Sequence, residues 1–385
     1  MKINYFALIA VYAMFLALGM PDGAFGVAWP IIRYEMGLPL EIASVLIVVH
    51  SIFYSLAGRT TGRVGSVFGT ENLSAAGLGV MMLGMGTFVF APSFLWLVIA
   101  TVFLGMGMGV TDSGLNAYAA SNFAAKHMNW VHGFWGMGGM VSPIIMSQMI
   151  IFHGWRMGYA TILVLQFVIV GFVVVLIFKG LLATEKTEAA QEDDAPRDGK
   201  FLTKVRYQHI QWVVFFLYIA VEYSVTFWTV SVLVEGRGLD ISVAGLYPAV
   251  YLGAMMVGRL IFGYATDKFS GINVIRAGLV VAIAGLFVLA FSDNIIGMAL
   301  IGFGFAPVFP CLMHETKRRF DPTLLMKLVG NQVAATGFGV GLSAIAIGQV
   351  LSRVSLELLF PILIGGIMAT FVLNEVIEFA QRRVK

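Results

Sequence analysis

Three carboxylic acids stand well inside long apolar stretches of the sequence: Asp22, Asp112 and Glu222. An ionisable side chain within an apolar membrane span is costly unless it faces a water-filled cavity or a partner, so such residues mark functional positions. The chemistry open to a carboxyl group there is hydrogen bonding to a polar ligand and the loading and release of a proton.

Asp112 has the surroundings expected of a proton carrier. The preceding Gly105, Gly107 and Gly109 offer no cation to pair with it, and they allow another helix to approach closely. Asn116 lies one helical turn further on, where its amide can hydrogen-bond either the carboxyl group or a ligand hydroxyl. A carboxyl group shielded from water holds a proton readily. The alternative is that Asp112 stays protonated and merely bridges two helices.

Asp22 and Glu222 occupy corresponding places in the two halves of the chain. Asp22 follows a proline between two glycines, a combination that weakens a helix and is tolerated where the helix lines a cavity. Trp29 lies two turns beyond Asp22, where its indole either stacks on the C–H face of a sugar ring or anchors the span at the membrane interface. Glu222, with Trp228 nearby, is interpreted as a residue that hydrogen-bonds the substrate. The alternatives are that Glu222 is a second proton site or that it binds sodium.

A further polar face lies at the start of another apolar stretch, where Asn129, His132 and Trp135 follow one another at helical spacing. Donors, acceptors and a stacking plane together suit a ligand with several hydroxyl groups. The alternative is that His132 is solvated at the mouth of the protein. Asn331 and Gln332 are additional candidates for ligand binding.

The elements that carry these residues are membrane spans. Of the 385 residues 59% are hydrophobic and only 12% are charged, against about a quarter in a soluble protein. Apolar runs long enough to cross a bilayer cover residues 5–34, 40–62, 70–91, 93–122, 128–152, 155–181, 207–234, 240–265, 272–292, 294–316, 328–352 and 355–380. The sequence therefore predicts an all-α polytopic membrane protein of twelve helices: a six-helix bundle in 1–181, a polar cytoplasmic linker in 182–206 and a second bundle in 207–385.

The distribution of positive charge predicts the orientation. Twenty of the 24 Lys and Arg residues fall in loops on the side of the chain ends, and the remaining four are Arg33, Arg156, Arg237 and Arg353. Because positive loops stay in the cytoplasm, we expect both termini there, in a bacterial inner membrane. No Lys or Arg is expected well inside a span, which favours a neutral ligand.

Several classes of protein are disfavoured. A net charge of +3 is too small for a nucleic-acid surface, and the single cysteine, Cys311, excludes an intramolecular disulfide. Nothing in the sequence resembles a metal cluster, a nucleotide-binding loop or a nucleophilic triad. We therefore expect neither enzymatic activity nor a cofactor or metal.

The two halves repeat a loop motif after their second spans: Gly58, Arg59 and Arg63 in the first half, and Gly263, Asp267 and Lys268 in the second. This motif resembles the Gly-x-x-x-Asp-(Arg/Lys) signature of the major facilitator superfamily, in which it gates the cytoplasmic side; Gly62 stands in the first copy where an Asp is usual.

Within that superfamily the chain resembles the fucose permease family of sugar–proton symporters. The similar segments are Asp112–Tyr118, Asn129–Gly136, Tyr218–Glu222 and Ala306–Pro310. The chain departs from the family pattern at Asp112, Ala117 and His132, which stand where Glu, Pro and Gln are usual. The resemblance implies that Asp22 serves substrate binding or proton coupling.

These observations predict proton-coupled symport of a neutral monosaccharide by alternating access between the two bundles, by a monomer in the lipid bilayer. The main alternative is a drug–proton antiporter that exports small amphipathic molecules. Residues 138–143 lack the Gly-Pro-x-x-Gly-Gly element usual in those exporters. A non-transporting membrane sensor is a second rival, and an organic-anion carrier would prefer a cationic cavity.

Overall fold

The computed structural model describes residues 4–123, 125–181, 201–202, 204–265, 270–321 and 325–384, and they are helical almost throughout. The first half contains α1 (Tyr5–Glu35), η1 (Leu40–Ile42), α2 (Ala43–Phe68), α3 (Thr70–Val89), α4 (Phe94–Asn122), α5 (Ala125–His153) and α6 (Trp155–Phe178). The second half contains α7 (Val205–Ser231), η2 (Val232–Gly236), α8 (Ile241–Ala244), α9 (Leu246–Ala265), α10 (Gly271–Phe291), α11 (Ile296–Phe305), α12 (Val308–Arg319), α13 (Leu325–Arg353), η4 (Leu356–Leu358) and α14 (Leu359–Val384).

Twelve helical segments in the described part of the chain are long and apolar enough to cross a membrane, as the sequence predicts. Two of these spans consist of two consecutive α-helices: α8 with α9, and α11 with α12. Three others join an α-helix to a short η element: η1 with α2, α7 with η2, and η4 with α14. The break between α11 and α12 falls at Ala306 and Pro307, where proline supplies no amide hydrogen to continue the helix. The helix α1, by contrast, runs unbroken through Pro21 and Pro30. Most of the predicted linker, 182–206, lies outside the described residues.

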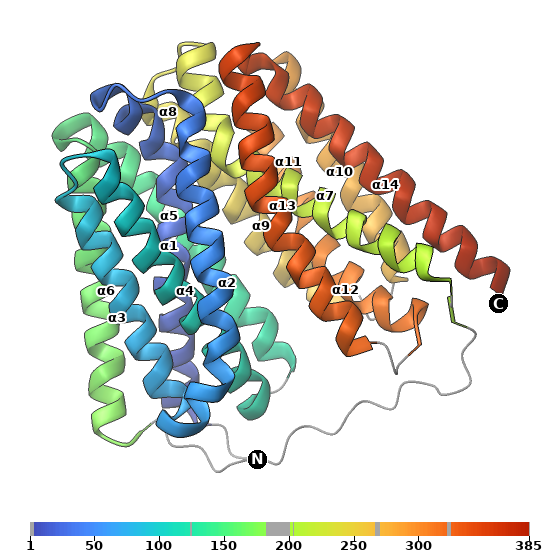
Figure 1. Cartoon of the computed structure of the whole chain (residues 1–385), viewed down its shortest axis with the longest axis horizontal. Helices are drawn as coiled ribbons and strands as arrows, with labels where there is room; N and C mark the ends of the chain where they lie inside the picture. Colours follow the sequence, from blue (N-terminus) through green and yellow to red (C-terminus); the bar gives the residue numbers. More distant parts are fainter. Residues whose placement is uncertain are drawn as a thin grey trace.

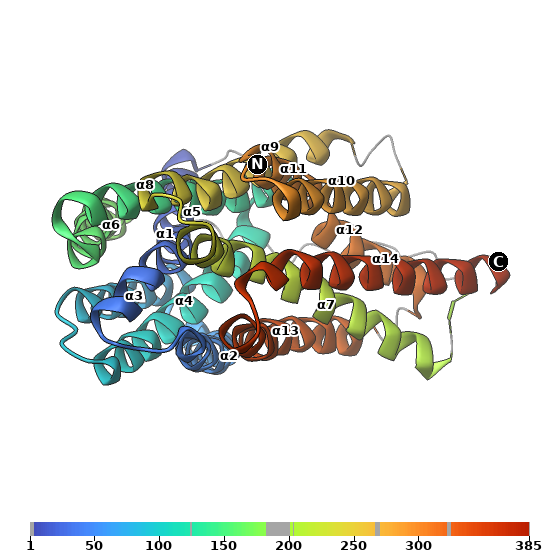
Figure 2. The same cartoon turned by 90° about the horizontal axis from the view of Figure 1, so that it is seen from above.

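The helices form two bundles that meet along the middle of the molecule (Figure 1; Figure 2). At the junction α1, α2 and α5 of the first bundle contact α7, α9 and α13 of the second. The outer helices are α3 and α6 on one side and α10 and α14 on the other. A site between the bundles is therefore lined by the junction helices.

The bundles are tied together at the end opposite the chain termini. The Arg33 guanidinium, in the last turn of α1, forms an ion pair with Glu235 in η2, with Nε 2.8 Å from Oε1. Backbones also approach closely there: a Cβ on Gly26 would lie 3.1 Å from the carbonyl oxygen of Phe227. In Figure 1 the two bundles diverge from this end toward the side of the termini.

Within each bundle, glycine allows the helices that carry site residues to touch through their backbones. A Cβ on Gly109 in α4 would lie 2.2 Å from the carbonyl oxygen of Tyr54 in α2. The second bundle repeats this contact, since a Cβ on Gly302 in α11 would lie 2.1 Å from the carbonyl oxygen of Tyr251 in α9. Even one methyl group would therefore push these helices apart, and the glycine-mediated approach expected next to Asp112 is present.

The structure alters the expected position of the first loop motif. Gly58, Arg59 and Arg63 are expected in a loop, but α2 continues to Phe68 and contains all three. The chain turns only at Gly69, whose φ of 83° favours glycine. In the second copy, Gly263 lies in the last turn of α9, whereas Asp267 and Lys268 fall outside the described residues.

We expect Gly109→Ala to destabilise the protein, because the added methyl group must separate α2 from α4. Overpacking of this kind costs about 1–3 kcal/mol. Gly79→Ala is the matched control, since no atom lies within 4 Å of a Cβ at that position. Thermal unfolding of the purified protein measures both changes. Equal melting temperatures for the two variants would contradict the proposed role of this contact.

Candidate functional site

A cavity of about 840 Å³ lies between the two bundles. Its walls come from the junction helices, from α4 and α12, and from single residues of α3 and α6, and most of the lining side chains are apolar. Of the predicted site residues, those that line it are Asp22, Asp112, His132, Trp135 and Glu222. The three carboxyl groups that the sequence singled out thus share one cavity.

Asp112 is held by two neutral hydrogen-bond donors. The Tyr54 hydroxyl of α2 donates to Oδ2 at 2.6 Å, and the Asn116 amide, one turn along α4, donates to Oδ1 at 2.9 Å. Gly109 brings Tyr54 within reach, because it allows α2 to lie against α4. The described residues include no ion-pair partner for Asp112. Its carboxyl group can therefore exchange a proton with the cavity without first breaking a salt bridge.

Asp22 is exposed to the cavity, and its carboxyl group accepts a hydrogen bond of 3.1 Å from the indole nitrogen of Trp135. The Trp135 ring, in α5, is in turn covered by the Arg259 guanidinium of α9, with Cζ 5.8 Å from the ring centroid. A cation above an aromatic face is attracted by the ring quadrupole. The chain Asp22–Trp135–Arg259 thus joins a carboxyl group of the first bundle to a cation of the second.

Arg259 is the main residue that the sequence interpretation missed. That interpretation assigned it to a loop, yet Arg259 belongs to the span Ile241–Phe262, close to its end, and lines the cavity. The cavity therefore contains a cation that the sequence interpretation did not expect. The charge of Arg259 acts on Glu222 and His132, but no ion pair with Glu222 is formed. Its Nε atom is buried without a hydrogen-bond partner among the described residues. The predicted apolar run 240–265 already includes Arg259, six residues before its end, and this position indicated that Arg259 belongs to a span rather than to a loop.

Other polar side chains of the cavity were not predicted. His50 of α2 lines the wall, with Nε2 3.4 Å from the Met108 sulfur. Tyr54, Tyr251 and Thr226 line the wall too. No sequence motif points to them, because a tyrosine in an apolar span is common and its role depends on which helix faces it.

Two tryptophans predicted to bind substrate, Trp29 as a stacking surface and Trp228 beside Glu222, lie outside the cavity wall. Trp29 is fully buried, donates from its indole nitrogen to the carbonyl oxygen of Leu40 at 3.2 Å, and so fixes the turn after α1. Trp228 is also fully buried, and its ring packs within 3.2 Å of the position that a Cβ on Gly348 would take. Both rings contribute to helix packing.

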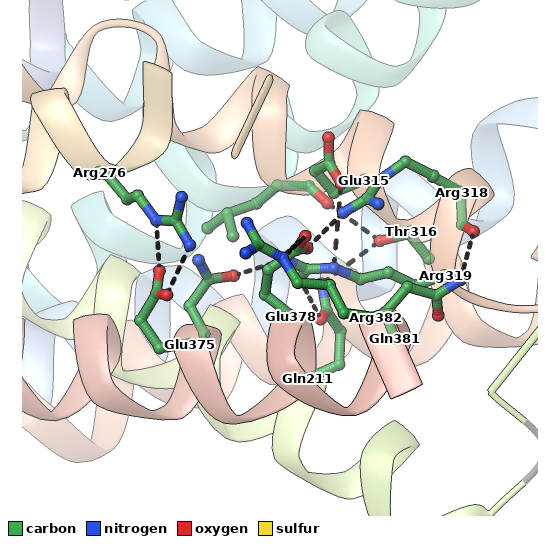
Figure 3. Close-up of polar contacts among 12 residues, drawn as sticks. Gln211, Arg276, Glu315, Thr316, Arg318, Arg319, Glu375, Glu378, Gln381 and Arg382 are labelled. Atoms are coloured by element: carbon green, nitrogen blue, oxygen red, sulfur yellow. Dashed lines mark hydrogen bonds and ion pairs between the residues drawn. The ribbon is translucent and has the colours of Figure 1, made fainter. Parts of the chain in front are cut away.

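Gln332 is absent from the cavity wall and belongs to a buried polar network in the second bundle, in which Thr316 and Arg319 are labelled in Figure 3. Its amide donates to the Thr316 hydroxyl at 3.1 Å. Beside it the buried Arg319 donates to Gln211 and to Asn374, both at 2.9 Å. These bonds link α7, α12, α13 and α14, so the network stabilises the bundle itself.

Three predicted asparagines contribute no described side chain to the cavity wall. Asn116 contacts Asp112 and is absent from the wall. Asn331 is partly buried on α13 and is also absent from the wall, and Asn129 belongs to α5, with no described side-chain placement. The described residues contain no group of three potential metal ligands.

Two helical bundles that enclose a mostly apolar cavity with a few polar and charged side chains have the architecture of a membrane carrier. A model of the Major Facilitator Superfamily matches residues 10–353, and the chain belongs to this superfamily of secondary transporters.

Similar proteins vary in their named roles. A Yersinia pestis protein described as an uncharacterized MFS-type transporter is 25% identical, over 78% of this chain and 77% of the relative. Bypass of stop codon protein 6 of Saccharomyces cerevisiae is 25% identical over 68% of this chain, which spans 57% of that relative's length. Membrane sensor protein UhpC of Salmonella typhimurium is 22% identical over 81% of this chain and 74% of the sensor.

Solved structures agree on the fold. The nucleoside transporter NupG matches with a TM-score of 0.78 at 13% identity, covering 97% of this chain and 99% of that one. The peptide transporter POT in complex with sulfate matches with a TM-score of 0.77 at 11% identity, covering 98% and 94%. Identities this low support the fold alone, and the narrower resemblance to fucose permeases stays a prediction.

Cys311, the only cysteine of the chain, lines the cavity and provides a built-in probe of access. We expect a small membrane-impermeant thiol reagent to label it faster from the side of the chain termini, because the bundles are tied together at the other end. Val340→Trp should slow labelling by filling the cavity, and Cys311→Ser should abolish it. Faster labelling from the opposite side would contradict this expectation.

Proposed function

We propose that this transporter couples the uptake of a neutral sugar to protons, with Asp112 as the principal proton carrier. The observation that carries the proposal is the setting of Asp112 in the cavity wall, bonded only to neutral donors among the described residues. Neutralising such a carboxyl group lowers the cost of closing an apolar cavity around it. Proton loading would therefore favour the occluded state.

Asp22 would be the second coupling group. Its charge interacts with that of Asp112 across the cavity. Two like charges in one low-dielectric space repel, so ionising one carboxyl group favours protonation of the other. A sugar bound between them would meet the indole of Trp135 and the hydroxyls of Tyr54 and Tyr223, all in the cavity wall. Aromatic faces and hydroxyls are suitable partners for a sugar ring.

The proposed cycle follows from the arrangement of the bundles. In the proposed orientation, with both termini in the cytoplasm of a bacterial cell, this conformation would be the inward-facing one, since the Arg33–Glu235 ion pair would join the bundles on the outer side. Sugar and proton would leave toward the more alkaline cytoplasm, and the empty monomer would return. The two copies of the repeated motif, Gly58, Arg59 and Arg63 in the first half and Gly263, Asp267 and Lys268 in the second, would form the cytoplasmic gate of the opposite state.

Asp112→Asn is expected to abolish concentrative sugar uptake and to leave sugar exchange measurable in proteoliposomes. Asparagine keeps the size and hydrogen-bonding capacity of the side chain but carries no titratable proton. Asp240→Asn is the matched control, because Asp240 is an exposed helix cap outside the cavity. Full concentrative uptake by the Asp112 variant would exclude Asp112 as the carrier. If the wild-type protein moves no sugar in either assay, a sensor role like the one in the name of UhpC becomes the better proposal.

A sugar acid or another organic anion is the second candidate substrate, favoured by Arg259. Its partly buried side chain lines the cavity, and its buried Nε atom has no hydrogen-bond partner in the described part of the chain. Glu222 competes with an anionic substrate for the charge of Arg259, however. Glu222, Asp22 and Asp112 all line the cavity, and their carboxylates would repel an anion. The neutral sugar is therefore the primary proposal.

Opposite effects of two variants distinguish these substrates. If the cargo is anionic, we expect Arg259→Gln to weaken its binding roughly tenfold or more, because a charged hydrogen bond is lost. Glu222→Gln should strengthen anion binding, since it removes the competing carboxylate. If the cargo is a neutral sugar, Arg259→Gln and Glu222→Gln should not change its binding affinity in opposite directions. Isothermal titration with a monosaccharide and its uronic acid measures both cases.

A further inference from the structure

A second, shallower hollow lies on the outer face of the second bundle, between α7 and α14, which run side by side (Figure 1; Figure 2). Its volume is about 410 Å³, and we call it the α7–α14 groove. Tyr207 is its wall residue from α7; the α14 residues are Phe371, Val372, Glu375, Val376, Phe379, Ala380 and Arg383. Several of these apolar side chains are exposed, including Phe379 at 58%. The transported solute has no part in this site.

The groove matches one leaflet of a bilayer in length and polarity. From Phe371 to Arg383, α14 rises about 18 Å at 1.5 Å per residue. One leaflet contributes about 15 Å of hydrocarbon, half of the bilayer core. Apart from Glu375, the α14 wall is apolar along this length, and it ends in an arginine where the helix ends. A single acyl chain lying along α14 would therefore place its headgroup next to Arg383.

Two guanidinium groups stand at that end of the groove. Arg383 lies over the Phe379 ring, with Cζ 4.3 Å from the centroid, and Arg206 donates to the Tyr207 hydroxyl at 2.8 Å. Among the residues that the structure describes, neither one forms an ion pair with a carboxylate. Both are held against aromatic rings, which leaves guanidinium hydrogens available to an incoming anion.

The acidic residues near the groove are already matched by other cations. Glu375, the carboxylate in the wall, receives two hydrogen bonds from Arg276 at 2.7 and 2.6 Å. Glu378 pairs with Arg318 and with Arg382, as Figure 3 shows. The open end of the groove thus has an excess of positive charge, from Arg206 and Arg383.

From an apolar groove one leaflet long, capped by these two arginines, we infer a binding site for an anionic phospholipid. The acyl chain packs against Phe379 and Val376, and the phosphate meets Arg206 and Arg383. A bidentate guanidinium suits a phosphate diester, and a second negative charge on the lipid adds to the attraction. A zwitterionic lipid fits the groove equally well but gains less from the two cations.

The test is native mass spectrometry of the full-length protein titrated with phosphatidylglycerol or phosphatidylcholine. We expect tighter binding of the first phosphatidylglycerol, and at least about a fivefold loss of its affinity in Arg206→Gln/Arg383→Gln. The control Lys179→Gln/Lys317→Gln removes two exposed basic residues from the same side of the membrane and should leave the affinity unchanged. Arg206→Lys/Arg383→Lys should retain most of the preference.

Val376→Trp tests the apolar half of the site without changing any charge. By filling the groove it should weaken the binding of both lipids. The inference is overturned if the wild-type protein binds the two lipids equally, or if Val376→Trp leaves lipid binding intact. It is also overturned if Arg206→Gln/Arg383→Gln and the control Lys179→Gln/Lys317→Gln lower the affinity for phosphatidylglycerol to the same extent.

Discussion

Carboxyl groups enclosed by membrane helices need solvation, and in this protein neutral side chains supply much of it. Tyr54 and Asn116 hydrogen-bond Asp112, and Trp135 hydrogen-bonds Asp22. Such donors stabilise an anion without binding it as permanently as a salt bridge would, so the same site accommodates the protonated acid. The hydrogen bond from Tyr54 to Asp112 depends on a nearby helix contact, because Gly109 lets the backbones of α2 and α4 touch and so brings Tyr54 within reach.

The two bundles contribute different charges to the shared cavity. The first carries Asp22 and Asp112, while the second carries Glu222 and Arg259. Because Arg259 lies over Trp135, which also bonds Asp22, the cation and one carboxyl group are connected through a single indole ring. Any rocking of the bundles must change this connection, which links the electrostatics of the cavity to its shape.

The fold and part of the site were accessible from the sequence, for physical reasons. Lipid imposes a fixed length on each apolar run, so twelve spans could be predicted. The cost of a buried charge singled out Asp22, Asp112 and Glu222, which the structure brings to one cavity. The environment of a tryptophan was less accessible: Trp29 and Trp228 have helical neighbours as suitable as those of Trp135, yet of these three only Trp135 lines the cavity. That difference depends on the rotation of each helix, which tertiary packing decides. Arg259 was misassigned because positive charge served as the criterion for a loop.

The ion pair between Arg33 and Glu235 has a consequence for how surroundings act on the protein. It joins the bundles at one end, and its side chains are 26% and 18% exposed, within reach of dissolved ions. Salt weakens such partly exposed pairs, whereas the close backbone packing of Gly26 against Phe227 involves no charged group and is insensitive to it. The stability of the conformation described here should therefore depend on the ionic strength on one side of the membrane only, and dissolved ions can act on it without entering the cavity.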